Sequence, residues 1–187
     1  MASEKELTQK TRKQSFQTPR GMKDILAEDW LYYDFILQNA KKIFEFYGFK
    51  RIETPLLEEA ELFTKGVGKK TEIVGKEMYL LKTKGEQGFL ALRPEGTAPI
   101  VRAYIEKGMF NLPQPIKLYY FGSFFRHEKP QAGRYRQFYQ FGAEIIGEDD
   151  IASEVKIIML SKIFLESLGF AKKDIFLLLN SIGCSKC

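Results

Sequence analysis

Residues 116–146 read IKLYYFGSFFRHEKPQAGRYRQFYQFGAEII, two long strand-like runs separated by a short segment that contains proline and glycine. We expect strands over 116–128 and 134–146, because Pro130 and Gly133 between them are typical of a turn or an extended hairpin loop. The stretch therefore predicts an antiparallel hairpin at the centre of the molecule.

The even-numbered positions of this hairpin carry an unusual set of side chains. Because side chains alternate across a strand, residues of one parity share a face. The even positions are Gly122, Phe124, Arg126 and Glu128 on the first run, and Arg134, Arg136, Phe138, Gln140, Gly142 and Glu144 on the second. If the two even faces coincide, one surface displays arginines, two carboxylates, an amide and an aromatic ring, with Gly142 leaving room beside them.

These side-chain types have distinct chemical uses. A guanidinium can grip a phosphate bidentately, an aromatic face can stack on a purine, and a carboxylate can accept hydrogen bonds from an amine. The set therefore suits a nucleotide together with an amino-bearing ligand. A solvated hairpin face with weak surface salt bridges is an alternative that alternation alone leaves open.

The segments around the hairpin predict helices and shorter strands. An apolar stripe indicates a helix over 24–47, with Gly48 as its C-terminal cap. Further helices are expected at 97–107 and at 151–168, where Gly169 ends the second, and further strands at 49–57, 78–81, 89–92 and 175–179. Adjacent antiparallel strands without regular strand–helix alternation predict an α+β fold rather than a doubly wound parallel sheet.

Composition excludes several classes of protein. The 187 residues are 44% hydrophobic and 28% charged, as in globular domains rather than disordered chains or disulfide scaffolds. No apolar run is long enough for a membrane span, and the N-terminal residues lack the apolar core of a signal peptide, so we expect a cytoplasmic protein. A net charge of +5 mildly favours an anionic partner.

Three local features have weaker implications. Residues 65–76 are expected to form a mobile basic loop, and GVGKKT at 66–71 lacks the spacing of a phosphate-binding loop. Cys184 and Cys187 have the spacing of half a zinc site or of a redox pair, without a second pair to complete a metal site. Pro55 removes a ladder donor, which places it at a sheet edge or an interface.

Four segments match motifs of one enzyme family. Residues 125–138 resemble motif 2 of class II aminoacyl-tRNA synthetases, and YGFKRIETPLL at 47–57 looks like motif 1, the helix, strand and proline segment of their dimer interface. RPEGTA at 93–98 and RYRQF at 134–138 narrow the resemblance to histidyl-tRNA synthetases, and TPRGMKD at 18–24 is similar to the bacterial form. The resemblance implies an antiparallel class II sheet flanked by helices, truncated before motif 3. Residues 1–18 would be a mobile lead-in and 19–187 the N-terminal part of the catalytic domain.

The resemblance assigns ATP to the even face. Arg126 would be the catalytic residue, because it would hold the α-phosphate and stabilise the charge that develops when the histidine carboxylate attacks. Glu128 would contact the adenine amino group, Phe138 would stack on adenine, and Arg134 would meet the γ-phosphate. Mg²⁺ would accompany ATP, and no protein metal ligands are predicted.

The same resemblance assigns histidine to a second set of residues. Glu95, Thr97 and Gln140 would hold the α-amino group, and Glu144 would recognise the imidazole. The activated histidine would then pass from the adenylate to the terminal ribose of tRNA(His). His127 lies on the opposite parity from Arg126, so we expect it to pack or hydrogen-bond rather than act as a general base.

The family pattern is incomplete in this sequence. No motif 3 with its second ATP-binding arginine and no anticodon-binding domain are recognisable, so we expect part of a larger homodimeric synthetase that is joined through motif 1. Two alternatives stay open. One is a non-catalytic paralogue such as the regulatory subunit of ATP phosphoribosyltransferase, and the other is a small basic RNA-binding module.

Overall fold

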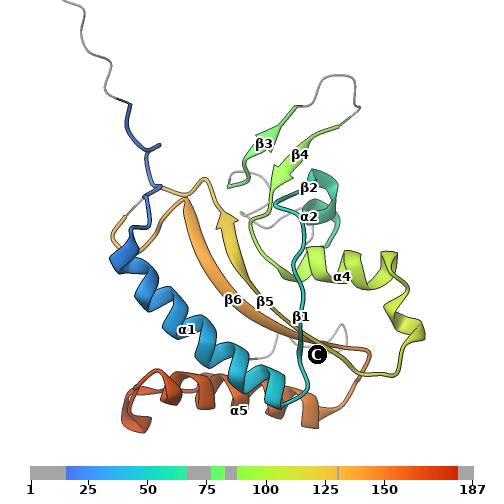
Figure 1. The fold of residues 1–187 in the computed structure, drawn as a ribbon. Coiled ribbons are helices and arrows are strands. Elements are labelled where there is room, and N and C mark those ends of the chain that lie inside the picture. The colour runs from blue at the N-terminus through green and yellow to red at the C-terminus, as the bar shows by residue number, and fades with distance from the viewer. Residues whose placement is uncertain (1–15, 67–76, 83–87, 130, 181–187) are drawn as a thin grey trace, which may run out of the picture.

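The computed structural model of this chain describes residues 16–66, 77–82, 88–129 and 131–180 (Figure 1). Its central sheet has the strand order β1-β5-β6. β5 (Ile116–Phe125) and β6 (Gln137–Ile146) form the predicted antiparallel hairpin, while β1 (Lys50–Arg51) pairs with β5 in parallel. The hairpin is the longest feature of the sheet, and the other elements are arranged around it.

The pairing register of the hairpin brings even-numbered residues opposite one another. Gly122 is the partner of Gln140, and Phe124 is the partner of Phe138. Directly opposed residues of an antiparallel pair project to the same face. The even faces of the two strands therefore coincide, which fulfils the condition that sequence alternation left open.

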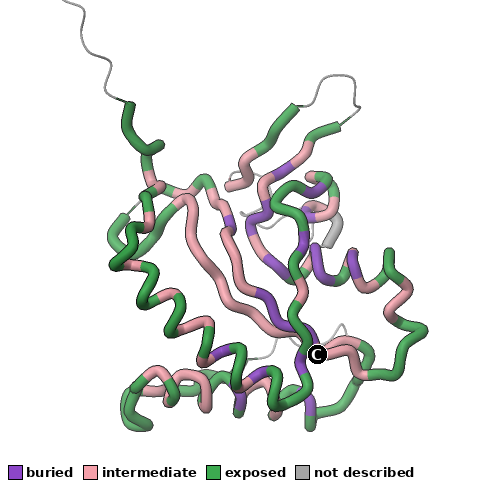
Figure 2. The backbone as a smooth tube through the Cα atoms, in the orientation of Figure 1, coloured by how far each residue is buried: buried purple, intermediate pink, exposed green. Residues whose placement is uncertain are grey.

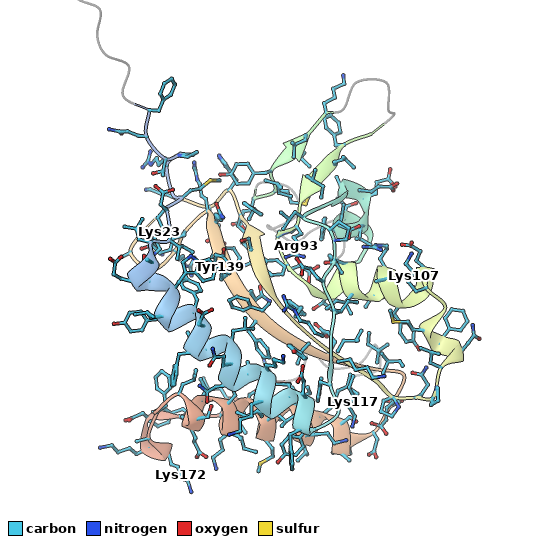
Figure 3. The ribbon with its side chains drawn as sticks, in the orientation of Figure 1. Lys23, Arg93, Lys107, Lys117, Tyr139 and Lys172 are labelled. Atoms are coloured by element: carbon cyan, nitrogen blue, oxygen red, sulfur yellow. The ribbon has the colours of Figure 1, made fainter. Side chains whose placement is uncertain are left out.

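Two helices cover the odd-numbered face of the sheet. α1 (Ala27–Phe46) and α5 (Ile151–Ser167) pack against each other, and Phe44 and Leu160 form a buried cluster with Tyr119 of β5. Figure 3 shows Tyr139 of β6 next to α1, where its ring meets that of Tyr33 with centroids 4.9 Å apart. This apolar layer anchors the hairpin from behind.

One end of the even-numbered face is covered by α4 (Thr97–Glu106). Ile100 of this helix packs with Leu118, Tyr120 and Phe124 in a second buried cluster. The burial colouring shows buried positions along β5 and α4, with half-buried positions along β6 (Figure 2). The even face therefore stays accessible towards the hairpin turn, where the charged residues lie.

A smaller antiparallel sheet lies beside the hairpin turn. Its strands are β2 (Leu57–Glu59), β4 (Leu90–Leu92) and β3 (Leu80–Leu81), in the order β2-β4-β3. α2 (Ala60–Gly66) follows β2, and two short 3-10 helices, η2 (Met109–Asn111) and η3 (Lys172–Asp174), complete the described elements. The amide of His127 donates to the Glu77 carbonyl at 2.6 Å, which joins the hairpin to the segment before β3.

Local signals set the boundaries of the long helices. α1 ends just before Gly48, whose φ of +83° lies in the left-handed region that glycine favours. α5 begins after Asp150, whose carboxylate accepts from the Ala152 amide at 3.1 Å. The predicted helices over 24–47, 97–107 and 151–168 are thus confirmed, with ends shifted by a few residues.

Three strand predictions are corrected. The single strand expected over 49–57 is wrong, because the chain instead forms short β1 and β2, with Pro55, which lacks an amide donor, in the irregular segment between them. The strand expected over 175–179 is absent, and Leu178 in it is 91% exposed. The hairpin strands are shorter than expected, because β5 ends at Phe125 and β6 begins at Gln137.

Some expectations concern residues outside the described ranges. These are the lead-in up to residue 15, most of the basic loop at 65–76, and the Cys184 and Cys187 pair. Residues 16–18 are described, and they are exposed without regular structure. Within the described ranges, no helix combines the length and apolar character needed to cross a membrane.

Candidate active site

The charged residues of motif 2 lie where the two hairpin strands diverge. Beyond the last ladder pair, the Arg126 amide still donates to the Arg136 carbonyl at 2.9 Å, and a bridge between Gln131 and Arg134 closes the turn. Arg126, Glu128 and Arg134 therefore lie on a hydrogen-bonded extension of the hairpin rather than within its strands.

All four residues predicted to bind ATP line one pocket of about 510 Å³. The Arg126 guanidinium is 5.2 Å from the centroid of the Phe138 ring, and Arg134 Nη1 lies 3.4 Å from Glu128 Oε2. The pocket is lined by Glu77, Arg126, Glu128, Gly133, Arg134, Tyr135, Phe138 and Tyr139. The site therefore combines two cations, two carboxylates and aromatic surface in a volume that suits a nucleotide.

The Arg126 side chain is oriented by the backbone of a neighbouring segment. Its Nε donates to the Pro94 carbonyl at 2.9 Å, while its Nη1 is 3.9 Å from Glu128 Oε1. A hydrogen bond through Nε leaves the outer nitrogens of a guanidinium available to other acceptors, and in Arg126 one of them faces Glu128. The Pro94 carbonyl and the Glu128 carboxylate therefore fix the orientation of the Arg126 side chain.

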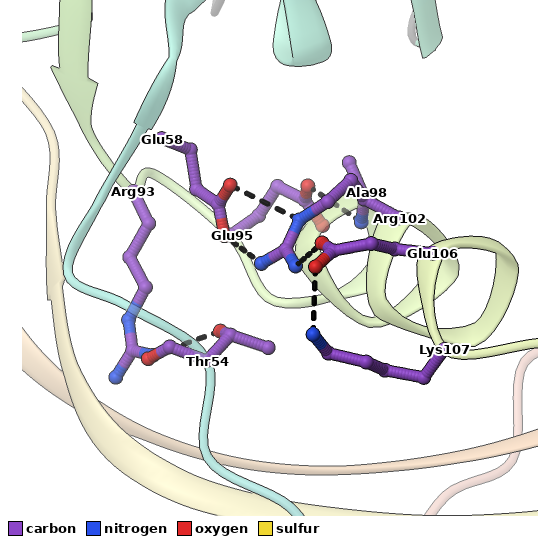
Figure 4. Close-up of polar contacts among 8 residues, drawn as sticks. All are labelled: Thr54, Glu58, Arg93, Glu95, Ala98, Arg102, Glu106 and Lys107. Atoms are coloured by element: carbon purple, nitrogen blue, oxygen red, sulfur yellow. Dashed lines mark hydrogen bonds and ion pairs between the residues drawn. The ribbon is translucent and has the colours of Figure 1, made fainter.

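The four residues predicted to bind histidine lie at the start of α4 and on the facing part of β6. Thr97 Oγ1 donates to Glu144 Oε1 at 2.8 Å, which joins the two elements directly. Glu95 accepts from the amide of Thr97 at 2.6 Å and so helps to cap the helix. It also accepts from the amide of Ala98 at 3.0 Å (Figure 4). Gln140 Nε2 donates to the Tyr120 hydroxyl at 2.9 Å. The predicted set is therefore brought together.

Burial and like charge shape the electrostatics of this second group. Desolvation, with a smaller contribution from the Glu95 carboxylate, raises the pKa of Glu144, while the hydrogen bond from Thr97 opposes the shift. The same two carboxylates and burial, which is the largest cause, raise the pKa of Tyr120 to about 12. The cluster is thus an anionic, partly desolvated site that suits a cationic ligand group.

One expectation about this surface is wrong. The space beside Gly142 is filled by the ring of Tyr120, and a Cβ added at Gly142 would overlap that ring. A Cβ added at Gly96, which directly precedes α4, would overlap the Tyr120 ring as well. Glycines at these positions therefore admit a protein side chain rather than a ligand. Only the register of the paired strands could have revealed this fit.

Arg93 begins the RPEGTA motif at 93–98, but sequence analysis assigned it no role. It is 4% exposed, and it donates to the Thr54 carbonyl at 2.7 Å and to the Ser123 carbonyl at 3.0 Å (Figures 3 and 4). Its guanidinium lies 4.5 Å from the centroid of the Phe124 ring, and burial lowers its pKa. The Cβ of a residue larger than glycine at Gly122 would come within 2.6 Å of this guanidinium.

The His127 ring contacts Tyr79 rather than the pocket that contains Arg126 and Phe138. This ring is exposed and makes an edge-on contact with Tyr79, with centroids 5.1 Å apart. His127 is not among the residues that line this pocket. This position agrees with the expected packing role.

A second cavity, of about 830 Å³, lies between the β1–β2 connection and α4. Arg102 on its wall pairs with the buried Glu58 and, at 2.7 Å, with Glu106, and Lys107 also contacts Glu106 at 2.7 Å (Figure 4). The hydrogen bonding of Arg102 to the Glu58 carboxylate, which accepts, is the main cause that raises the pKa of Arg102. Pro55 lines this cavity, and none of the predicted ATP or histidine residues does.

The antiparallel sheet with its flanking helices agrees with the fold of class II aminoacyl-tRNA synthetases, to which the similar solved structures belong. Residues 21–184 match the family profile described as histidyl-tRNA synthetase. The chain belongs to the histidyl-tRNA synthetase family.

Individual relatives agree with this assignment. The chain is 50% identical over 172 residues to a histidine–tRNA ligase of Dehalococcoides mccartyi, and 47% identical over 172 residues to that of Pseudothermotoga lettingae. Each alignment covers 92% of this chain but only 40% and 39% of the relative. The chain therefore spans about two fifths of the length of these curated relatives.

Solved structures show the same fold. The apo histidyl-tRNA synthetase of Staphylococcus aureus superposes with a TM-score of 0.70 at 38% identity, over 83% of this chain and 35% of that chain. A Bacillus halodurans protein, described as an ATP phosphoribosyltransferase regulatory subunit/histidyl-tRNA synthetase, superposes with a TM-score of 0.72 at 26% identity, over 84% of this chain and 39% of that chain.

Proposed function

We propose that this chain forms the ATP- and histidine-binding part of a histidine–tRNA ligase. The observation that carries the proposal is the convergence of Arg126, Glu128, Arg134 and Phe138 on one pocket. The polar cluster around Thr97 and Glu144 adds a separate place for the amino acid. The relatives named histidine–tRNA ligase support histidine as the substrate. Because this chain covers only 40% of such a relative, the complete charging reaction is itself part of the proposal.

The proposed reaction needs no protein nucleophile. The carboxylate oxygen of histidine bonds to the α-phosphorus of ATP, the bond from that phosphorus to the bridging oxygen breaks, and pyrophosphate leaves. Such phosphorus chemistry depends on positioning and on charge stabilisation. Arg126 would supply the charge at the α-phosphate, Arg134 would contact the γ-phosphate, Phe138 would stack on adenine, and Glu128 would accept from the adenine amino group.

Magnesium would enter this site with the nucleotide. Mg²⁺ prefers oxygen ligands and is held in nucleotide sites by one or two carboxylates together with phosphate oxygens. Glu77 lines the same pocket as Arg126 and could supply such a carboxylate, while Glu128 is reserved for the adenine amino group. When bound, the ion would neutralise charge on the phosphates.

Histidine would bind beside the nucleotide pocket. Glu95 and Gln140 supply oxygen acceptors for the α-ammonium group, with Thr97 between them, and Glu144 supplies an acceptor for an imidazole N–H. Glu144 and Thr97 already share a hydrogen bond of 2.8 Å. An imidazole that reaches Glu144 would therefore meet an oriented carboxylate.

The complete protein would add the remaining functions. Transfer of the activated histidine to tRNA(His) in the cytoplasm, and assembly of a homodimer through the segment that contains Pro55, belong to this proposal. The cavity beside Pro55 and the exposed Leu56 and Leu57 leave room and apolar surface there for a second copy.

A second candidate function is favoured by one comparison. The Bacillus halodurans structure is described as a regulatory subunit of ATP phosphoribosyltransferase as well as a histidyl-tRNA synthetase. A paralogue of that kind would respond to histidine without forming an adenylate. The ligase is favoured because this chain retains all four predicted motif 2 residues, Arg126, Glu128, Arg134 and Phe138, in one pocket.

Calorimetric titration of the chain tests the proposal. Histidine, and then ATP with Mg²⁺, should bind to the wild type, with glutamine as the control amino acid. Glu144→Gln should weaken the binding of histidine and leave the binding of ATP unchanged. Glu154→Gln, on the exposed first turn of α5, should leave both affinities unchanged. Absence of binding by both ligands contradicts the proposal, and histidine binding without ATP binding favours the regulatory alternative.

A further inference from the structure

Tyr120 of β5 lies at the centre of the predicted histidine site, although no sequence motif pointed to it. It is 7% exposed, and its hydroxyl oxygen accepts a hydrogen bond of 2.9 Å from the Gln140 side-chain amide. Glu95 and Glu144 are close enough to act on it electrostatically. Three of the four predicted histidine-binding residues thus surround one phenol.

The Tyr120 ring is held in a slot between two glycines. A Cβ at Gly96 or at Gly142 would overlap the ring. Gly96 precedes α4, which begins at Thr97, and Gly142 belongs to β6, which carries Gln140 and Glu144. The ring therefore touches both elements that supply the histidine site, and its hydroxyl has little freedom to move.

The contact with Tyr120 determines which end of the Gln140 amide is left for a ligand. A glutamine amide has an NH₂ group that donates and a carbonyl oxygen that accepts. With Nε2 engaged by Tyr120, Oε1 faces no donor among the described residues. A carbonyl oxygen is the atom that an ammonium group requires, because ammonium has only donors to offer.

The protonation state of Tyr120 is compatible with this arrangement. Burial, Glu144 and Glu95 raise the pKa of Tyr120 to about 12, so the phenol is neutral across the physiological range. The oxygen of a neutral hydroxyl can accept from the Gln140 side-chain amide. The hydrogen bond is therefore stable over the pH range in which a synthetase works.

We propose that Tyr120 is a positioning residue that fixes the Gln140 amide with its carbonyl oxygen towards the ligand and thereby selects an α-ammonium group. This role rests on the proposed function, since it assigns a part to Tyr120 in a site for histidine. Tyr120 does not itself touch the reacting atoms. Its effect is exerted through Gln140.

The first test compares two neighbouring tyrosines. Tyr120→Phe removes the hydroxyl and keeps the ring in its slot. Tyr119→Phe is the matched control, because Tyr119 is also buried but projects to the opposite face, where its hydroxyl donates to Glu45 at 3.0 Å. Calorimetry with histidine and with imidazolepropionate, which lacks the ammonium group, reports the α-amino contribution separately.

Loss of one hydrogen bond predicts a specific pattern of affinities. Tyr120→Phe should weaken the binding of histidine by roughly threefold to tenfold, as expected for one net hydrogen bond. The affinity for imidazolepropionate should stay unchanged. Tyr119→Phe should change neither. Equal weakening of both compounds by Tyr120→Phe would mean that the pocket has merely lost shape, and would overturn the positioning role.

A second readout needs no ligand. The Gln140 side-chain NH₂ gives a pair of ¹H–¹⁵N signals, which are identified by their loss in Gln140→Met. These signals should shift in Tyr120→Phe and stay in place in Tyr119→Phe. Unchanged Gln140 signals in Tyr120→Phe overturn the inference. If the Gln140 signals shift in Tyr120→Phe but the wild type binds neither histidine nor imidazolepropionate, the contact between Tyr120 and Gln140 is confirmed and the proposed function is contradicted.

Discussion

The buried guanidinium of Arg93 donates to the Thr54 carbonyl at 2.7 Å, and so ties the β1–β2 connection to the segment that leads into α4. The same side chain reaches Ser123 of β5 at 3.0 Å. Thr54 directly precedes Pro55, and Arg93 directly precedes Pro94, whose carbonyl orients Arg126. One cation therefore connects the proposed dimer segment with the approach to the proposed nucleotide pocket.

Arg93→Met should destabilise the chain by about 2 to 4 kcal/mol, because it leaves buried carbonyl groups without donors. Urea unfolding measures this change. Arg51→Met is the control, since Arg51 is half exposed and makes only a weak contact with Glu53 at 3.6 Å. Equal stabilities of the two variants would show that the Arg93 contacts contribute nothing specific.

Arg126→Ala should lower the rate of histidine-dependent pyrophosphate exchange by about 10² to 10³, the loss expected for one preorganised donor at a developing charge. The assay uses a histidine–tRNA ligase of full length that carries this segment. Arg51→Ala serves as the control for loss of a surface arginine. An exchange rate within about twofold of the wild type would remove Arg126 from the mechanism.

Gly142→Ala should destabilise the fold by about 1 to 3 kcal/mol, because its Cβ overlaps the Tyr120 ring. The double variant Gly142→Ala with Tyr120→Leu should lose less than the sum of the two single changes, since the smaller side chain removes the overlap. Urea unfolding of the wild type, the two single variants and the double variant measures the coupling free energy between positions 120 and 142. Simple additivity would mean that the two positions do not touch.

The stability of the wild type should fall as the pH rises from the ordinary pKa of a glutamate through the raised pKa of Glu144. In that window the folded chain binds more protons than the unfolded chain, so deprotonation favours unfolding. Glu144→Gln should remove this part of the pH dependence. Thr97→Val should extend the window upwards, because the Thr97 hydrogen bond lowers the pKa of Glu144.

Unfolding in urea from about pH 4 to about pH 8 measures these profiles. Glu154→Gln is the control for removing one carboxylate at an exposed helix position. A profile of Glu144→Gln that parallels the wild type would contradict the assigned shift.

Sequence periodicity predicted the elements whose signals are local. The apolar stripe and Gly48 defined α1, and the parity of the hairpin placed Arg126, Phe138 and Glu144 on one face. Parity succeeds there because a strand has a fixed period of two and the short turn leaves few alternatives for the register.

Features that depend on distant contacts could not be predicted in the same way. The run at 175–179 is apolar enough for a buried strand, yet burial needs a neighbouring surface, and none of the described elements covers it. The fit of Tyr120 between Gly96 and Gly142, and the reach of Arg93 to Thr54, follow from three-dimensional approach rather than from spacing in the sequence.

In the proposed complex, the even face of the hairpin holds the nucleotide and the amino acid side by side. A crystal structure of the chain with a non-hydrolysable histidyl-adenylate analogue, histidyl-sulfamoyl adenosine, would show both ligand parts at once. We predict adenine against Phe138, the sulfamoyl group at Arg126, the ammonium group at Glu95 and Gln140, and the imidazole at Glu144. An analogue bound instead in the cavity beside Pro55, or absent at saturating concentration, would mean that this face is not the binding site.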